Sequence, residues 1–263
     1  MKILVLGAGG MLGHRVVRAL QGLEVIAPSR KDYKAPSPLA KFNLTTEDYV
    51  VNCIGAIPQK GHTGESMAKL NTHFPHLLNM EGLRVIQIAT DCAFSGSRGS
   101  YTETDARDAT DEYGISKING EILEFMNLRT SIIGPELTGK KSLFEWVRNQ
   151  PTGATINGYA NHYWNGITTD AFGQIVRGIV ETRRFHSGIQ HIIPADKVSK
   201  LQLVKAIAKR LGRTDLEILP TIANSVDRTL DTIAPETNLG LWRLAGYLQP
   251  PTIEELITAM EID

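Results

Sequence analysis

The pattern of apolar and polar positions predicts short buried strands that alternate with helices along most of the chain. Each apolar run has the length and β-branched content of a strand that is covered on both faces. The predicted strands span residues 2–6, 23–27, 48–54, 85–89, 127–133 and 189–193. This alternation is typical of an α/β fold with a doubly wound parallel sheet.

Helical periodicity follows several of these strands. The predicted helices span residues 14–20, 64–80, 113–125, 172–180, 198–211 and 253–260, and a short one begins near 140. Pro75 lies inside the second of these helices and predicts a kink or a break there. Between Arg30 and Tyr49, by contrast, there is too little chain for a helix and a strand. Pro36 and Pro38 disfavour a helix further, so one βα unit of the usual doubly wound pattern is expected to be cut down.

Composition limits the class of protein. The 263 residues suit one large domain, or a main domain with a smaller appendage, and 42% hydrophobic residues can build a sizeable core. The formal net charge is zero, so the basic footprint of a nucleic-acid-binding protein is absent. The two cysteines make no disulfide framework, and no metal-ligand spacing is visible. No apolar run is long enough for a membrane span, and we expect a cytoplasmic protein with no bound metal.

A glycine-rich turn follows the first predicted strand. Gly7, Gly10 and Gly13 are spaced as G-x-x-G-x-x-G, and a helical pattern follows at once. Glycines allow a tight turn and a close approach of the backbone to a pyrophosphate, which then rests on the helix N-terminus. Strand, glycines and helix in this order predict a dinucleotide site in a Rossmann-like domain.

The residues after the second strand indicate which dinucleotide binds. An NAD site usually has an acidic residue about twenty positions past the glycines, to bind the ribose 2′-hydroxyl. Here the sequence reads Pro28-Ser29-Arg30-Lys31. A hydroxyl and two cations suit a 2′-phosphate, because an arginine offers fork-shaped donors to phosphate. The pattern favours NADPH, with NADH as the second choice.

Three residues carry candidate chemistry. Thr90 stands at the carboxyl end of the predicted strand 85–89, where ligands bind in open α/β sheets. Tyr113 and Lys117 are four apart in a helical pattern, so they share one face. A phenol near an ammonium has its ionised form favoured, so we expect a lowered pKa for Tyr113 and an acid or base usable near neutral pH.

The character of the chain changes after Pro135. Aromatic residues gather between 144 and 164, next to a polar, glycine-bearing stretch. They suit a small lid over a polar substrate, or simply the core of that lid. We therefore assign 1–135 to the dinucleotide-binding domain, with returns of strand and helix from about 165–195. Residues 136–263 are expected to form mainly a small C-terminal substrate-binding lobe.

Together these residues resemble an extended short-chain dehydrogenase/reductase, and more narrowly the dTDP-4-dehydrorhamnose reductase (sugar-nucleotide-binding) family. The resemblance runs nearly from end to end. The residues that carry it are Gly7, Gly10, Gly13, Asn71, Thr90-Asp91, Phe94, Tyr101-Thr-Glu103, Asp105, Tyr113-Gly-x-Ser-Lys117, Gly120-Glu121, Arg129-Thr130-Ser131, Gly166-Ile-Thr-Thr169 and Val198-Ser199-Lys200.

The resemblance implies an NADPH-dependent reduction of the 4-keto group of a nucleotide-diphospho-6-deoxysugar, for the synthesis of cell-surface polysaccharide precursors. Tyr113 would give the proton to the alkoxide, Lys117 would lower its pKa and hold the ribose, and Thr90 would bind the same oxygen. The implied cofactor-binding residues are Gly7, Gly10, Met11, Leu12, Gly13, Ser29, Arg30, Cys53, Gly55, Ala56, Asn71, Tyr113 and Lys117. The implied substrate-binding residues are Asp91, Cys92, Trp146 and Trp164.

Two alternatives stay open. Cys92 occupies a position similar to the catalytic cysteine of GDP-fucose synthase, which epimerises its substrate before reducing it. A cysteine there can carry a proton to and from carbon if its thiolate is favoured. The other alternative is a non-catalytic, dinucleotide-binding regulatory subunit that binds a partner enzyme. The sequence leaves the oligomeric state open, with a homodimer as one option.

Overall fold

The central element is a parallel sheet of six strands. A computed structural model describes residues 1–262. The sheet has the order β10-β5-β4-β3-β1-β2, and every neighbouring pair is parallel. Its strands are β1 (Ile3–Leu6), β2 (Val25–Ile26), β3 (Tyr49–Asn52), β4 (Arg84–Thr90), β5 (Met126–Thr130) and β10 (Gly188–His191). The strand order reverses beside β1, which confirms the predicted doubly wound α/β fold.

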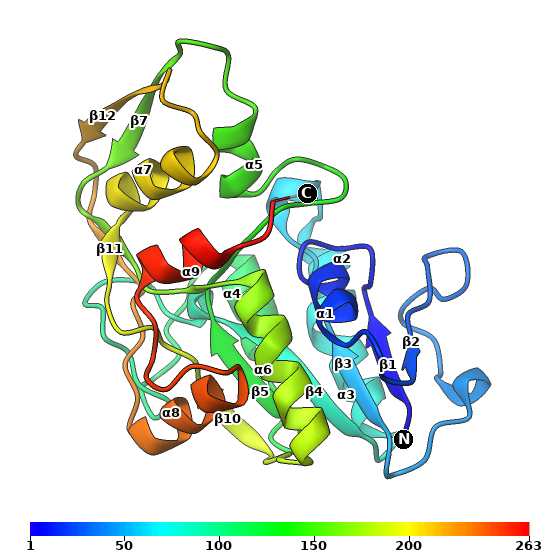
Figure 1. The fold of residues 1–263 in the computed structure, drawn as a ribbon. Coiled ribbons are helices and arrows are strands. Elements are labelled where there is room, and N and C mark those ends of the chain that lie inside the picture. The colour runs from blue at the N-terminus through cyan, green and yellow to red at the C-terminus, as the bar shows by residue number, and fades with distance from the viewer. Residues whose placement is uncertain (263) are drawn as a thin grey trace.

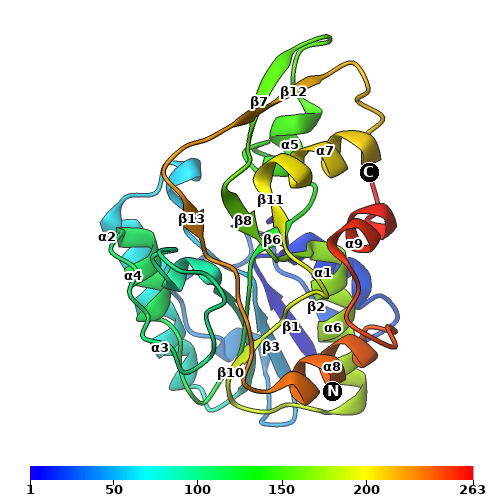
Figure 2. The ribbon, with the colours of Figure 1, turned by 90° about the vertical axis from the view of Figure 1, so that its left-hand side faces the viewer.

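Helices cover both faces of the sheet, as Figures 1 and 2 show. Ile3 and Val5 face one layer, formed by α1 (Gly13–Ala19), α6 (Thr169–Thr182) and α8 (Pro235–Leu244). Leu4 and Leu6 face the other layer, which contains α3 (Phe74–Asn79). Successive side chains of a strand point to opposite faces, so this four-residue apolar strand is buried on both sides.

The connection from β2 to β3 contains almost no regular structure, as its length and its prolines predict. Within the described residues 27–48 the only regular element is a three-residue 3-10 helix, η1 (Ala40–Phe42). The strand that would continue the sheet beyond β2 is therefore missing. The adenine end of a dinucleotide would lie next to a loop at this edge.

Two predicted helices differ from the observed ones. The predicted helix 64–80 is divided into α2 (Gly64–Met67), a π-helix η3 (Ala68–His73) and α3. The interruption precedes Pro75, which has no N–H to donate to the preceding turn. The helix that contains Tyr113, α4 (Glu112–Ile118), ends before the predicted 125. A Cβ at Gly120 would lie 1.8 Å from the Asn71 carbonyl oxygen, so the chain passes too close to η3 for a longer helix.

A smaller lobe lies above the carboxyl ends of the strands in Figure 1. Its core contains Phe144, Trp164 and Leu203. Its elements are α5 (Leu143–Arg148), β7 (Thr155–Tyr159), β8 (His162–Trp164), β11 (Val198–Ser199), α7 (Lys200–Arg210), β12 (Glu217–Thr221), β13 (Val226–Asp227) and α9 (Ile253–Ala259). The strands β6 (Ile132–Ile133) and β9 (Ile167–Thr168) form a parallel pair between the lobe and the sheet. Two 3-10 helices follow strands of the main sheet: η2 (Pro58–Lys60) comes after β3, and η4 (Asp91–Ala93) comes after β4. The chain also returns to the sheet at α8, whose Trp242 is fully buried against it.

Candidate functional site

Thr90 ends β4 and starts the turn that presents the next two residues. Its hydroxyl accepts a hydrogen bond from the Cys92 amide at 3.1 Å and donates to a carboxylate oxygen of Asp91 at 3.3 Å. The first bond caps η4, because a threonine hydroxyl can satisfy an amide that the short helix leaves open. Asp91 and Cys92 are therefore held directly past the sheet edge.

Helix α4 places Tyr113 beside this turn. Asp111 caps the helix by accepting from the Gly114 amide at 2.8 Å. A Cβ at Gly114 would lie 2.4 Å from the Cys92 carbonyl oxygen, so only glycine permits this approach of α4 to η4. Thr90 and Cys92 are close enough to the Tyr113 phenol to shift its pKa in opposite directions. The structure thus brings Thr90, Cys92 and Tyr113 together.

The expected lowering of the Tyr113 pKa is wrong. Burial raises the pKa of the Tyr113 phenol, and the neighbouring Cys92 and Asp91 raise it further, against the Thr90 hydrogen bond. Lys117 donates instead to the Ile88 carbonyl at 2.9 Å, so its ammonium is tied to the sheet. Burial lowers the pKa of Lys117 to about 8, with Glu121 acting in the opposite direction. A neutral phenol is the form that can donate a proton.

Asn71 connects the loop after β3 to α4. Its buried amide accepts from the Ala56 N–H at 2.8 Å and donates to the Ala56 carbonyl at 2.9 Å. The same amide nitrogen donates to the Ser116 hydroxyl at 3.0 Å, which in turn donates to the Tyr113 carbonyl at 2.8 Å. These bonds use the Asn71 amide to join the loop after β3 to α4. Asn71 therefore fixes the loop from Cys53 to Ala56 against the helix that carries Tyr113.

The glycine-rich turn fits a dinucleotide. Gly7 has φ +79°, and its α-carbon faces the Cys53 backbone, where an added Cβ would lie at 3.0 Å. A Cβ at Gly13 would be 2.1 Å from the Gly7 carbonyl oxygen, so α1 can start this close only with glycine. Gly9 and Gly55 face open space, and no side chain of the described residues caps the N-terminus of α1. The backbone at the switch point of the sheet is therefore open to a phosphate group.

The end of β2 carries the predicted Ser29 and Arg30, both exposed. Among residues 1–262 no hydrogen bond or ion pair engages the Arg30 side chain, so it is open to a 2′-phosphate. The Ser29 hydroxyl donates to Asp32 at 2.6 Å. Asp32 is an acceptor suited to a ribose 2′-hydroxyl and stands about twenty positions past the glycines. It is a candidate residue that was not predicted from the sequence. Because NADH carries a 2′-hydroxyl at this position, Asp32 is compatible with NADH as the second cofactor.

The predicted substrate-binding residues lie in different surroundings. Burial raises the pKa of the Cys92 thiol to about 12, with Asp91 adding to the shift and Arg228 opposing it. Trp146 on α5 is 40% exposed, whereas Trp164 on β8 is 3% exposed and packs in the core of the lobe. Trp164 is therefore placed to support its neighbours rather than to contact a ligand. Lys200 and Arg228 carry no role predicted from the sequence, because nothing near them in the chain links them to Cys92.

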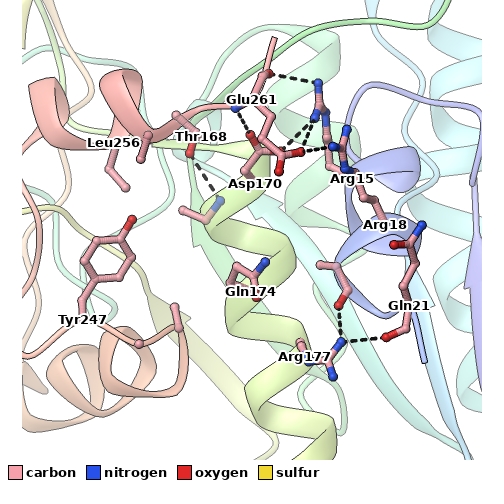
Figure 3. A pocket seen from close by; sticks show the side chains of 15 residues that line it. Arg15, Arg18, Gln21, Thr168, Asp170, Gln174, Arg177, Tyr247, Leu256 and Glu261 are labelled. Carbon is pink, nitrogen blue, oxygen red and sulfur yellow. Dashed lines mark hydrogen bonds and ion pairs between the residues drawn. The ribbon is translucent and has the colours of Figure 1, made fainter. Parts of the chain in front are cut away.

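A cavity of about 690 Å³ lies outside this group, between α1, α6 and the C-terminal segment. Figure 3 shows Arg15, Arg18, Asp170 and Glu261 directed toward one another at one side of it. None of the predicted site residues, all of which the structure describes, lines its wall. Within residues 1–262 there is no cluster of three or more metal-ligating side chains and no helix that could cross a membrane.

The sheet order, the open glycine-rich turn and the grouping of Thr90, Tyr113 and Lys117 define an NAD(P)-dependent oxidoreductase of the extended short-chain dehydrogenase/reductase class. Within that class, the chain belongs to the RmlD substrate binding domain family, which matches residues 1–232.

Three individual proteins show what the chain is similar to. The chain is 25% identical to methionine adenosyltransferase 2 subunit beta of Danio rerio over 250 residues, which cover 83% of this chain and 76% of the relative. It is 32% identical over 133 residues to the dTDP-4-dehydrorhamnose reductase of Burkholderia thailandensis, covering 46% of this chain and 45% of the relative. The fold is similar to the crystal structure of the Bacillus anthracis dTDP-4-dehydrorhamnose reductase in complex with NADP, with a TM-score of 0.77, 16% identity and 98% of each chain covered.

Proposed function

We propose that this protein reduces the 4-keto group of a nucleotide-diphospho-6-deoxysugar with NADPH, in the synthesis of cell-surface polysaccharide precursors. The observation that carries the proposal is the position of the Tyr113 phenol. It lies at the carboxyl edge of the sheet, next to the Thr90 hydroxyl and one helical turn before Lys117. The reductase of Burkholderia thailandensis and the NADP-bound structure from Bacillus anthracis support the substrate class and the cofactor.

The residues have separate roles in the proposed reaction. When bound, NADPH would supply the hydride for the carbonyl carbon. Tyr113, held neutral by burial, gives its proton to the oxygen at C4 as negative charge develops there. Thr90 donates a hydrogen bond to the same oxygen, which stabilises that charge. Lys117, one helical turn after Tyr113, fixes α4 to the sheet through its bond to the Ile88 carbonyl. Asn71 holds the Cys53–Ala56 loop against α4.

The glycine-rich turn and the end of β2 would hold the cofactor. The backbone from Gly7 to Gly13, including Met11 and Leu12, is open to the pyrophosphate. Arg30 and Ser29 are exposed where a 2′-phosphate would lie, and Asp32 suits a 2′-hydroxyl. We therefore propose NADPH as the preferred cofactor and NADH as the weaker one.

Two observations bear on the alternatives. The raised pKa of Cys92 keeps it as a thiol, which favours simple reduction over epimerisation followed by reduction. The similarity to methionine adenosyltransferase 2 subunit beta favours the regulatory alternative. Complete retention of Thr90, Tyr113 and Lys117 in one cluster favours catalysis, because binding of a dinucleotide alone does not need a proton donor.

The test is consumption of NADPH with dTDP-, UDP- and GDP-linked 4-keto-6-deoxysugars, using the purified chain alone. We expect turnover with at least one of them and a product reduced at C4. Tight NADPH binding without turnover on any of the three would support the regulatory subunit. Deuterium uptake at C3 or C5 in D₂O without NADPH, lost in Cys92→Ser, would support the epimerase.

The partner is proposed to be a nucleotide sugar, with no nucleic acid or membrane involved. We further propose a homodimer in the cytoplasm. Size-exclusion chromatography with light scattering tests the dimer, and a mass of one chain at micromolar concentration would contradict it.

A further inference from the structure

Two cations of the lobe converge on the turn that follows Thr90. Arg228, just after β13, has its Nη1 3.8 Å from the Cys92 sulfur and its Nη2 3.8 Å from the Asp111 carboxylate. Lys200, the first residue of α7, follows Ser199, and Arg228 follows Asp227; Ser199 and Asp227 pair with Tyr163 of β8 from its two sides. The charges of Asp91, Cys92 and Arg228 act on the Lys200 ammonium. Both side chains therefore border the same space as Cys92.

The position of Arg228 is fixed by the backbone. Its Nε donates to the Phe94 carbonyl at 2.9 Å. The adjacent Asp227 amide donates to the Gly96 carbonyl at 2.8 Å, and Gly96 has φ +86° with the Arg228 side chain where a Cβ would be. The loop after η4 thus holds the Nε end of the guanidinium. The outer nitrogens are left with a weak sulfur acceptor and a carboxylate at the limit of an ion pair.

Lys200 is held in place by its helix and by an aromatic ring, but among residues 1–262 it forms no ion pair. The capping box of Ser199 and Gln202 fixes the start of α7, and the ammonium lies 5.5 Å from the centre of the Trp164 ring. Among residues 1–262 no hydrogen bond or ion pair engages it. Burial lowers the pKa of Lys200, and Arg228 adds to this, while Asp91 and Cys92 oppose it. A partly buried ammonium that forms no ion pair is costly, so the site suits a ligand that brings further negative charge.

We propose that Lys200 and Arg228 bind the diphosphate of the nucleotide sugar. The inference rests on the proposed function, because it assumes a substrate that enters beside Thr90 and Cys92. A diphosphate matches two cations, one of them an arginine fork whose free nitrogens can pair with phosphate oxygens. The sugar would then extend from this pair toward Tyr113. The lobe thereby supplies the charge for binding, while the sheet domain supplies the proton.

Lys197 offers a matched control for Lys200. It also lies over an aromatic ring, with 5.3 Å from its Nζ to the centre of Tyr163. Its side chain is 52% exposed and pairs with Asp227 at 3.7 Å. Lys197→Met and Lys200→Met each remove one positive charge, three residues apart. Only the second removes it from the space beside Cys92.

The experiment measures binding of dTDP, UDP, GDP and inorganic pyrophosphate by calorimetry to the full chain with NADPH bound. We expect Lys200→Met to weaken the best nucleoside diphosphate about tenfold or more, and the corresponding monophosphate much less. Arg228→Lys keeps the charge but loses the fork, and should show an intermediate loss. The affinity for NADPH should stay within twofold in all variants, and Lys197→Met should match the wild type.

Equal diphosphate affinity in Lys200→Met and Lys197→Met would overturn the inference, as would a wild type that binds none of the four compounds. A loss of monophosphate affinity as large as that of the diphosphate would also overturn it. The outcome is separate from the proposed function. If diphosphates bind through Lys200 but no ketosugar is reduced, the reductase proposal fails alone. If ketosugars are reduced and Lys200→Met leaves their KM unchanged, the diphosphate assignment fails alone.

Discussion

At the scale of single residues, burial sets the protonation of the candidate site. Burial raises the pKa of Tyr113 and lowers the pKa of Lys117, so it favours the neutral form of each. Each side chain loses water when α4 packs against η4 and β4. Their spacing in the sequence predicts a shared helix face, and both do lie on α4. It does not predict burial, because burial depends on the packing of α4 against η4 and β4, where Gly114 allows a close approach to Cys92. For this reason the direction of the Tyr113 shift could not be obtained from the sequence.

Replacement of Tyr113 by phenylalanine tests its role as proton donor. Tyr113→Phe should fold and bind NADPH with unchanged affinity, because the ring and the α4 backbone are kept. Turnover of the ketosugar should fall by about 10²–10⁴-fold, the usual effect of a general acid. Steady-state kinetics and fluorescence titration with NADPH measure the two quantities. A variant with near-normal kcat would exclude Tyr113 from the mechanism.

The buried Lys117 predicts a pH dependence of stability. Its pKa of about 8 lies below the value in an unfolded chain, so the unfolded state binds more protons between about pH 8 and 10. In that window the Lys117 contribution makes the folded protein more stable as pH rises, by up to about 1.4 kcal/mol per pH unit. Below pH 8 the full cost of burying the ammonium remains. Lys117→Met should remove this rise, which urea unfolding of both proteins at pH 7, 8, 9 and 10 can measure. Parallel curves for the two proteins would contradict the assignment.

At the scale of elements, local patterns predicted the strands of the main sheet and the long amphipathic helices well. α6 and α7 lie close to their predicted bounds, because their apolar faces recur with helical period. The small strands β7 and β12 were missed, since their burial depends on α7 packing over them. The early end of α4 was also missed, because it follows from contact with Asn71 in a distant segment.

The geometry of the glycine-rich turn requires a glycine at position 13 but not at position 9. In Gly13→Ala the added methyl would stand 2.1 Å from the Gly7 carbonyl oxygen, so α1 or the turn must move. We expect a loss of about 3 kcal/mol in the free energy of unfolding and weaker NADPH binding. Gly9→Ala is the matched control, because no protein atom lies within 4 Å of its added Cβ. Urea unfolding measures the stability of both variants. Equal stability of the two would show that the close approach is not required.

The short edge of the sheet at β2 should decide the choice of cofactor. Arg30→Ala should weaken NADPH about 10–100-fold and NADH little, because only NADPH carries the 2′-phosphate. Asp32→Asn should act in the reverse sense, with a larger effect on NADH. Calorimetric titration of each variant with both cofactors gives the comparison. If Arg30→Ala weakened both cofactors equally, the arginine would be an ordinary surface charge.

At the scale of the whole molecule, the C-terminal segment fastens the lobe to the sheet domain. The Met260 carbonyl accepts from Arg210 of α7 at 2.6 Å. One residue later, Glu261 pairs with Arg18 of α1 at 2.6 Å, and its amide donates to Asp170 of α6 at 2.8 Å. Figure 3 shows the second set of contacts at the end of α9. The lobe supplies the proposed diphosphate site and the sheet domain supplies Tyr113, so this attachment sets the distance between them.

The side chain of Met260 tests this attachment. It is fully buried in the core of the lobe, so Met260→Ala should lower the free energy of unfolding by about 2–5 kcal/mol. Met80→Ala is the matched control, since Met80 is 83% exposed and its loss should change stability by less than about 0.5 kcal/mol. Met260→Ala should also raise KM for the ketosugar while the NADPH affinity stays constant, because the lobe loosens and the glycine-rich turn does not. If KM were unchanged in a clearly destabilised variant, the segment would stabilise the fold without positioning the lobe over the substrate.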